Sequence, residues 1–196
     1  MANISIEEIK KLKELSGVGL TDAKQALVEA NGDFDKALEA MRKKGLTKAE
    51  KRGDRETREG LIDSYVHDGR IGAIVEVNCE TSFVAKTDEF KDLAHKIAMQ
   101  VASMAPLYVS TENIPEDVMN AKRKELEENF KGPEKMKDQI IEGQIKKAFS
   151  DKVLMEQPYI LDDTKTVAEF IKDAIAKTGE NITVKQFKRI ELGVTE

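Results

Sequence analysis

The stretch that decides the fold is Asn78-Cys79-Glu80-Thr81-Ser82-Phe83-Val84-Ala85-Lys86, where a strand pattern ends and a helical pattern begins. Before it, Ile71 to Val77 alternates apolar residues with others, as a half-buried strand does. After it, apolar residues recur at helical spacing: Phe90, Leu93, Ala94, Ile97, Ala98 and Val101. The sequence therefore predicts a strand followed by a long helix. Thr81 or Ser82 would cap that helix, because a hydroxyl can accept a hydrogen bond from an unpaired N–H of the first turn.

Two residues of this junction have no local role in that prediction. Phe83 and Val84 follow the capping position, where neither side chain helps to end the strand or start the helix. A large apolar side chain at a helix start is more often a core anchor than an exposed contact residue. Both interpretations of Phe83 stay open on chemistry alone.

A hairpin is predicted just before the junction. Leu61 to Val66 and Ile71 to Val77 flank His67-Asp68-Gly69-Arg70, and Asp-Gly supplies the positive φ angles of a type I′ turn. A further strand is expected from Ile182 to Leu192. Its alternation slips near Gln186 and Phe187, which indicates a bulge or a strand partly buried on both faces.

The remaining segments favour helices around a small sheet. Helical patterns run from Pro115 to Phe130, from Glu134 to Phe149 and from Thr166 to Gly179, and Leu107-Tyr108-Val109 resembles a short strand. The helices at 115–149 carry few apolar residues, so a solvated helical hairpin is the simplest interpretation. Together these patterns predict an α+β core with a small antiparallel sheet and helices on one face.

The N-terminal segment is typical of a compact three-helix bundle. Ser5 and Glu8 form a capping box, Asn31-Gly32 makes a turn, Asp33 caps the third helix, and Gly45 is expected to end it. This pattern is similar to a ubiquitin-associated domain. The expected organisation is a bundle at 1–45, a charged linker or frayed helix at 46–60, and a core domain at 61–196.

Composition excludes several classes of function. The net charge is −5, 35% of residues are charged and Trp is absent, which disfavours a nucleic-acid binder. No run approaches the roughly 20 apolar residues of a membrane span. A single cysteine, Cys79, cannot form an internal disulfide, and the chain begins without a signal-peptide pattern, so a cytoplasmic protein is expected.

Catalytic and metal-binding constellations are not recognisable in the sequence. His67 and His95 have no partner at metal-ligand spacing, so neither a metal nor another cofactor is expected. Gly17-Val18-Gly19 follows a helical pattern and lacks the third glycine of a dinucleotide fingerprint, so it is interpreted as a helix-to-helix turn. A thiol site of Cys79, His67 and Asp68 can be drawn, although a lone cysteine is more often a small buried hydrophobe.

Two separated motifs resemble the elongation factor Ts family of guanine-nucleotide exchange factors, which act on the GTPase elongation factor Tu. Residues 16–33 match one signature, and Thr81-Ser82-Phe83-Val84 resembles the family's Thr-Asp-Phe-Val motif. The likeness runs from Ile4 to the final Phe187-Lys188-Arg189-Ile190-Glu191-Leu192-Gly193, and it fits the shorter form of the family. The bundle expected at 1–45 is also the fold of the family's N-terminal domain.

The resemblance implies a mechanism and a set of contact residues. Phe83, with Thr81, Ser82 and Val84, would insert into the partner's GTPase domain and disturb its Mg²⁺ and phosphate site, so that GDP leaves and GTP rebinds. A second contact would come from the N-terminal bundle through Lys10, Lys13, Gly17, Val18, Gly19 and Leu20. The short form implies a homodimer, and no enzyme activity, direct nucleic-acid contact or membrane contact is implied. Ser82 departs from the usual Asp, which would lose about 0.3–1 kcal/mol of favourable charge at the helix start.

Two rival functions remain compatible with the sequence. A three-helix bundle with a glycine turn also suits an adaptor that binds ubiquitin or a similar modifier, since fold alone does not define function. Cys79 would be the centre of the second rival, a thiol enzyme.

Overall fold

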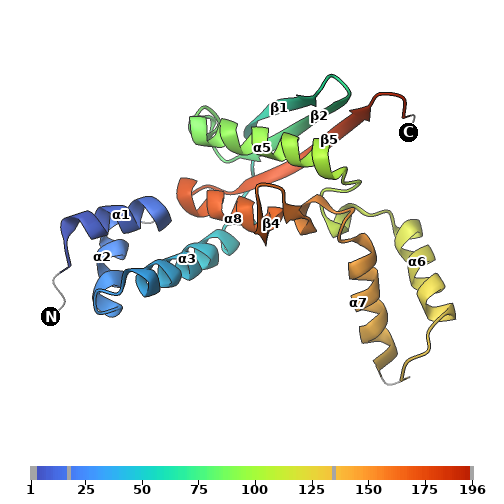
Figure 1. Ribbon diagram of the computed structural model, residues 1–196, viewed down its shortest axis with the longest axis horizontal. Helices are drawn as coiled ribbons and strands as arrows, with labels where there is room; N and C mark the ends of the chain where they lie inside the picture. The colour runs from blue at the N-terminus through green and yellow to red at the C-terminus, as the bar shows by residue number, and fades with distance from the viewer. Residues whose placement is uncertain (1–3, 17–18, 134–135, 195–196) are drawn as a thin grey trace. The chain divides into compact units, whose positions relative to one another are not determined.

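The hairpin turn forms as its sequence predicts. In a computed structural model that describes residues 4–16, 19–133 and 136–194, β1 (Glu59–His67) and β2 (Ile71–Cys79) flank the turn (Figure 1). Asp68 and Gly69 have φ angles of 48° and 66°, and the Arg70 N–H donates to the His67 carbonyl at 2.9 Å. Positive φ at both central residues is the requirement of a type I′ turn.

A third strand, β5 (Ile182–Glu191), completes a sheet of order β1-β2-β5. The Asn181 N–H donates to the Glu80 carboxylate, and the Leu192 N–H donates to the Arg70 carbonyl, so β5 runs opposite to β2. The predicted α+β fold with a small antiparallel sheet is confirmed.

One face of this sheet is covered by α5 (Asp88–Met104). β2 buries every second residue: Ala73, Val75, Val77 and Cys79. Tyr65 of β1 meets His95 of α5 in a T-shaped ring contact, and the Arg189 Nε of β5 donates to the Ala102 carbonyl of α5 at 3.0 Å. The apolar residues predicted at helical spacing, from Phe90 to Val101, are all buried in this helix.

The phase slip expected in β5 is present. Ile182 and Val184 are buried, the next two residues are exposed, and the partly buried positions then fall on Phe187 and Arg189. The strand therefore changes the parity of its covered residues midway.

The N-terminal segment forms α1 (Ile6–Ser16), α2 (Leu20–Glu29) and α3 (Phe34–Glu50). The predicted capping box is confirmed, because the Glu8 N–H donates to Ser5 Oγ at 3.1 Å and the Ser5 N–H donates to the Glu8 carboxylate at 2.9 Å. The buried core of this bundle consists of Ile9, Leu12, Ala23, Ala26, Leu27, Ala37 and Met41. The apolar residues Ile6 and Leu15, which share the helical spacing, are exposed.

The turn between α2 and α3 also follows the sequence. Asn31 and Gly32 have positive φ, and Asp33 Oδ1 accepts the Lys36 N–H at 3.1 Å. The end predicted for the third helix is wrong, since Gly45 lies inside α3, which continues to Glu50. One glycine costs a helix about 1 kcal/mol and does not by itself end it.

The predicted helical pair is present as α6 (Glu116–Glu128) and α7 (Lys137–Phe149). Apolar residues of both helices pack together with residues that flank the pair: Ile114, Val118, Met119, Leu126, Phe130, Ile141, Ile145, Phe149 and Val153. The short strand expected at Leu107-Tyr108-Val109 is only an isolated parallel bridge between Tyr108 and Val153. The short 3-10 helices η1 (Thr111–Asn113) and η3 (Leu154–Glu156) flank the pair in sequence.

A second, two-stranded sheet was not predicted. β3 (Pro158–Tyr159) and β4 (Asp162–Thr166) pair antiparallel before α8 (Val167–Thr178), which ends at Gly179 with φ 78°. The buried Gln100 of α5 donates from Nε2 to Gln157 Oε1 at 3.1 Å. Its own Oε1 accepts the Ile160 N–H at 2.8 Å, so a satisfied amide network holds this segment against α5.

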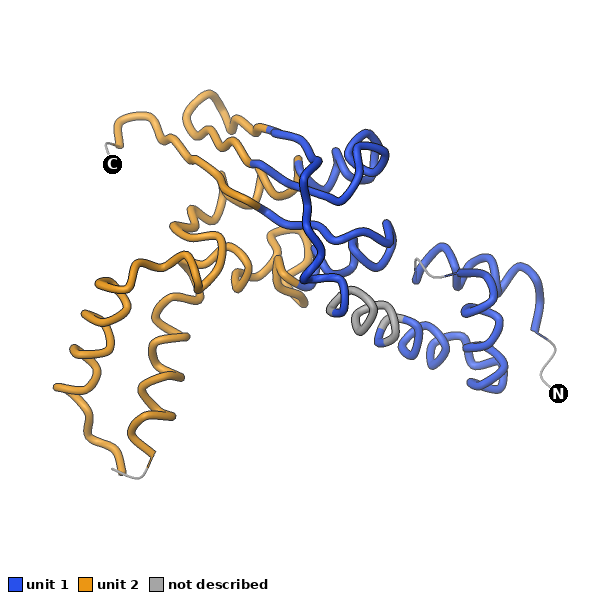
Figure 2. The backbone as a smooth tube through the Cα atoms, turned by 180° about the vertical axis from the view of Figure 1, so that it is seen from behind, with its two compact units in different colours: residues 1–63, 76–94, 169–184 blue, residues 64–75, 95–168, 185–196 orange. Residues whose placement is uncertain are grey.

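The chain divides into two compact units, each assembled from segments that are distant in sequence (Figure 2). One unit contains residues 1–63, 76–94 and 169–184, and the other contains residues 64–75, 95–168 and 185–196. Among the helices of the described residues, none has the length and apolar character needed to cross a membrane.

Two glycine substitutions should change stability in opposite directions. A Cβ at Gly60, whose φ is 153°, would lie 2.2 Å from the Val77 carbonyl oxygen, whereas a Cβ at Gly143 in α7 meets nothing within 4 Å. We expect Gly60→Ala to lower the free energy of unfolding by at least about 2 kcal/mol and Gly143→Ala to raise it by about 0.5–1 kcal/mol. Urea denaturation measures both, and a neutral Gly60→Ala would contradict the close approach of β1 to β2.

Candidate functional site

The Phe83 motif lies on a single helical turn, α4 (Ser82–Ala85), directly after β2. Thr81 is its N-cap, with extended backbone angles and a side chain that accepts the Val84 N–H at 3.5 Å. The cap is therefore Thr81, and Ser82 is the first helical residue. The turn closes with an Ala85 N–H to Thr81 carbonyl bond of 3.2 Å.

The prediction of one continuous helix after Ser82 is wrong, because the chain breaks between α4 and α5. Thr87 Oγ1 donates to the Val84 carbonyl at 2.8 Å and accepts the Phe90 N–H at 3.2 Å. Thr87 thus ends the first helix and caps the second, in which Asp88 and Glu89 occupy the first turn. A threonine followed by two acidic residues is a helix-start signal in the sequence that the longer apolar pattern masked.

Phe83 is 84% exposed, so the structure favours the contact interpretation over the core anchor. Ala85, on the same turn, is buried and Val84 is half-buried. The turn therefore presents its one aromatic side chain to solvent while its neighbours face the protein. Aromatic residues are enriched in the cores of protein–protein interfaces, so Phe83 is a candidate contact residue.

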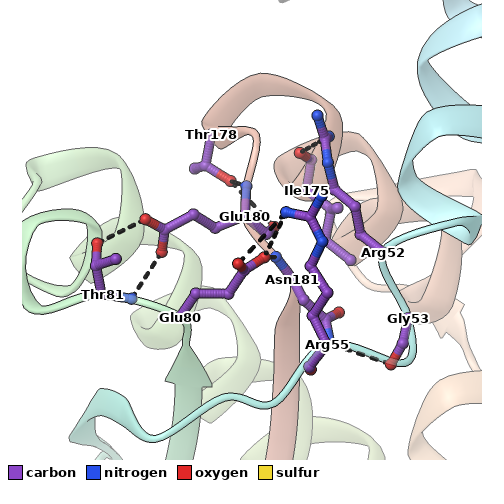
Figure 3. A network of polar contacts seen from close by, with 9 residues as sticks. All are labelled: Arg52, Gly53, Arg55, Glu80, Thr81, Ile175, Thr178, Glu180 and Asn181. Carbon is purple, nitrogen blue, oxygen red and sulfur yellow. Dashed lines mark hydrogen bonds and ion pairs between the residues drawn. The ribbon is translucent and has the colours of Figure 1, made fainter.

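The N-cap residue, Thr81, is hydrogen-bonded to a carboxylate from another part of the chain. Figure 3 shows Glu180, from the loop after α8, facing Thr81. Glu180 Oε1 accepts the Thr81 hydroxyl at 2.6 Å, and Glu180 Oε2 accepts the Thr81 N–H at 3.0 Å. Both carboxylate oxygens are thus used on one residue.

A second carboxylate, that of Glu80 just before the N-cap, accepts a hydrogen bond from the same loop. Glu80 Oε1 accepts the Asn181 N–H at 2.6 Å, and Arg55 Nη1 lies 3.4 Å from both Glu80 oxygens (Figure 3). The buried Asn181 side chain donates from Nδ2 to the carbonyls of Gly53 at 3.1 Å and Arg55 at 2.7 Å. Glu80 and Thr81 are therefore joined to the loop residues Glu180 and Asn181 by hydrogen bonds in both directions.

This network gives the segment 46–60 backbone contacts, while most side chains between Lys51 and Gly60 are exposed. The helical alternative holds as far as Glu50, and the backbone of Gly53 and Arg55 is then bound by Asn181. Arg52 Nη1 also lies 3.4 Å from the Ile175 carbonyl of α8. Sequence reasoning missed Glu180 and Asn181, because contacts between residues about 100 positions apart leave no local pattern.

The other predicted contact residues belong to the N-terminal bundle. Lys10, Lys13 and Gly19 are exposed, and Leu20 is a half-exposed apolar residue at the start of α2. Gly19 is the N-cap of α2, and Leu20 is the first residue of this helix. Gly17 and Val18 lie outside the described residues.

Neither a thiol nor a metal site receives support. Cys79 is fully buried, its thiol donates to the Thr81 carbonyl at 3.2 Å, and burial followed by the charge of Glu180 raises the pKa of the thiol. Neutral thiols are poor nucleophiles. His67 is exposed and interacts with Tyr65 and Asp68, and the described residues contain no group of three or more side chains suited to a metal.

An exposed aromatic residue on a doubly anchored turn is a feature suited to contact with another macromolecule. The family model for elongation factor Ts matches residues 4–194. Elongation factor Ts of Thermotoga maritima is 52% identical over 192 residues, covering 97% of this chain and 96% of that protein. The proteins of the same name from Fervidobacterium nodosum and Moorella thermoacetica are each 48% identical, covering 97% of this chain and 98% and 96% of their own lengths.

The chain therefore belongs to the elongation factor Ts family. It is an elongation factor of protein biosynthesis by family, and its membership supports a general role in nucleotide exchange on elongation factor Tu.

Because the pKa of the Cys79 thiol is raised, we expect this residue to make the free energy of unfolding depend on pH. The unfolded chain releases the thiol proton above about pH 8.5 while the folded chain retains it, so rising pH favours unfolding. We expect this contribution to reach at most about 1.4 kcal/mol per pH unit and to disappear in Cys79→Ala. Urea denaturation of both proteins between pH 7 and 10 measures it, and parallel pH profiles would contradict the buried, neutral thiol.

Proposed function

We propose that this protein binds elongation factor Tu·GDP and promotes GDP release, with Phe83 as the residue that disturbs the partner's Mg²⁺ and phosphate site. The observation that carries the proposal is the 84% exposure of Phe83 on a capped and anchored turn. Thr81 holds the turn, while Ser82 and Val84 flank the aromatic ring and extend the contact. The proposed mechanism makes and breaks no covalent bond and uses no cofactor of this chain.

Exchange of this kind follows from reciprocal coupling between two ligands of one partner. If this protein binds nucleotide-free elongation factor Tu more tightly than the GDP complex, GDP and this protein weaken each other's binding by the same factor. Faster release also requires that the ternary transition state is stabilised. A rigid aromatic side chain pushed against the elements that hold Mg²⁺ would do so, because Mg²⁺ neutralises the phosphate charge that keeps GDP bound.

The N-terminal bundle would make a second contact with the GTPase domain of the partner. Its apolar component is Leu20, beside Gly19, and Lys10 and Lys13 are exposed cations on α1. Gly17 and Val18 complete the contact in this proposal. We infer that residues 1–45 and 61–196 act as separate docking domains, joined by residues 46–60, and that the protein works in the cytoplasm with its partner.

A homodimer is proposed from the uncovered face of the sheet. Val66, Ile74 and Ile190, from three adjacent strands, are 64%, 47% and 74% exposed on the face opposite α5. Water-exposed apolar side chains on neighbouring strands favour burial against a second copy.

Charge on that face should dissociate the dimer. We expect Ile74→Lys with Ile190→Lys to halve the molar mass measured by light scattering, because the interface would then bury two unpaired ammonium groups from each protomer. Leu161→Lys, at an exposed apolar residue of the β3–β4 turn, is the matched control and should leave the mass unchanged. A monomeric parent protein would contradict the proposal.

The exchange function is tested by stopped-flow release of fluorescent GDP from elongation factor Tu. We expect strong acceleration by the parent protein and a loss of at least about tenfold in Phe83→Ala, because a central aromatic contact commonly contributes more than 1 kcal/mol. Leu161→Ala removes another exposed apolar side chain and should behave as the parent. A folded parent that does not accelerate release would contradict the proposed function, whereas a fully active Phe83→Ala would contradict only the role of Phe83.

A further inference from the structure

The turn that carries Phe83 is too short to hold its own shape. Helix α4 has four residues, and a single isolated turn is unstable because nucleation orders several residues for one hydrogen bond. Its side-chain cap, from Thr81 Oγ1 to the Val84 N–H, is long at 3.5 Å. Contacts from outside the helix must therefore fix the direction of Phe83.

The strongest external contact is the two-pronged one from Glu180. The 2.6 Å distance between the Thr81 hydroxyl and Glu180 Oε1 is typical of a charge-assisted hydrogen bond. Because the hydroxyl donates its hydrogen bond to the carboxylate, its lone pairs remain available to the Val84 N–H, and the polarisation of the O–H bond by the negative charge makes them better acceptors. The second oxygen fixes the Thr81 N–H at the same time.

Glu180 is itself held on both sides along the chain. On one side, its N–H donates to Thr178 Oγ1 at 3.3 Å, and the Thr178 hydroxyl lies 2.9 Å from the Ala174 carbonyl of α8. On the other side, Asn181 is 2% exposed and makes three hydrogen bonds, to Glu80, Gly53 and Arg55. The carboxylate therefore acts from a fixed loop.

We propose that Glu180 is a positioning residue for Phe83. This inference rests on the proposed function and adds a residue to it. Glu180 makes no contact with the partner in this proposal. It acts through Thr81 by ordering the α4 turn before binding, which reduces the conformational entropy lost when Phe83 docks.

The test is Glu180→Gln, because the amide replaces one of the two carboxylate oxygens by an NH₂ donor, so the two Thr81 hydrogen bonds can no longer each have their own acceptor oxygen. We expect the concentration of this protein that gives half-maximal GDP release to rise about tenfold, with a plateau rate close to that of the parent. Glu127→Gln, at an exposed residue of α6, makes the same change in net charge and should match the parent.

A combined variant separates positioning from general loss of structure. In the Phe83→Ala background, Glu180→Gln should change the half-maximal concentration less than twofold, because the side chain to be positioned is absent. Equal fold losses in both backgrounds would overturn the positioning role. Thermal unfolding of each variant identifies any effect that comes from a destabilised fold.

A measurement without the partner keeps this inference distinct from the proposed function. Amide hydrogen exchange should become faster at Thr81 and Val84 in Glu180→Gln, while the amides of α5 keep their protection. Unchanged exchange at Val84 would overturn the positioning role even if the parent accelerates GDP release. If the parent fails to accelerate release and the Val84 amide loses protection, the exchange function fails while the ordering of the turn by Glu180 stands.

Discussion

The structure around Phe83 depends on the burial of alternate residues of β2. Ala73, Val75, Val77 and Cys79 face the covered side of the sheet, and each larger apolar side chain gains about 1.5–3 kcal/mol from leaving water. A shift of one residue would turn all four to the opposite face, so burial determines the register of the strand. Because the last inward residue is Cys79, the chain must leave the sheet at Glu80 and Thr81, and this sets where the α4 turn begins.

Polar contacts then fix what burial leaves undetermined. Glu80 and Thr81 exchange hydrogen bonds with Glu180 and Asn181, and Arg55 adds a partly exposed ion pair to Glu80. An exposed ion pair contributes little to stability, so the two short carboxylate contacts, of 2.6 Å each, are the stronger constraints. The apolar layer positions the junction, and the carboxylates orient the turn that follows it.

Local signals in the sequence predicted the elements that depend on neighbouring residues. The Asp68-Gly69 turn, the Ser5–Glu8 capping box and the helix cap at Asp33 all formed as expected, because each involves residues within a few positions of one another. The apolar period of α5 hides the break at Thr87, because the pattern alone does not show where the helix starts. The third helix continues past Gly45, because the low helix propensity of a single glycine is a weak effect that the surrounding structure overrides.

The candidate site divides along the same line. The motif at Thr81 to Val84 is recognisable in the sequence. Whether Phe83 is buried or exposed could be decided only from the fold. The contacts of Glu180 and Asn181 with this motif span about 100 positions of chain, and no periodicity or spacing encodes them.

A one-turn helix has too few internal hydrogen bonds to define its own geometry, so the residues that define it must come from elsewhere in the fold. A short, externally held turn can present an aromatic side chain farther from the protein surface than a long amphipathic helix, whose apolar face is drawn into the core. The weakness of α4 as an isolated helix is therefore consistent with its use as a contact element, provided that the carboxylates keep it ordered.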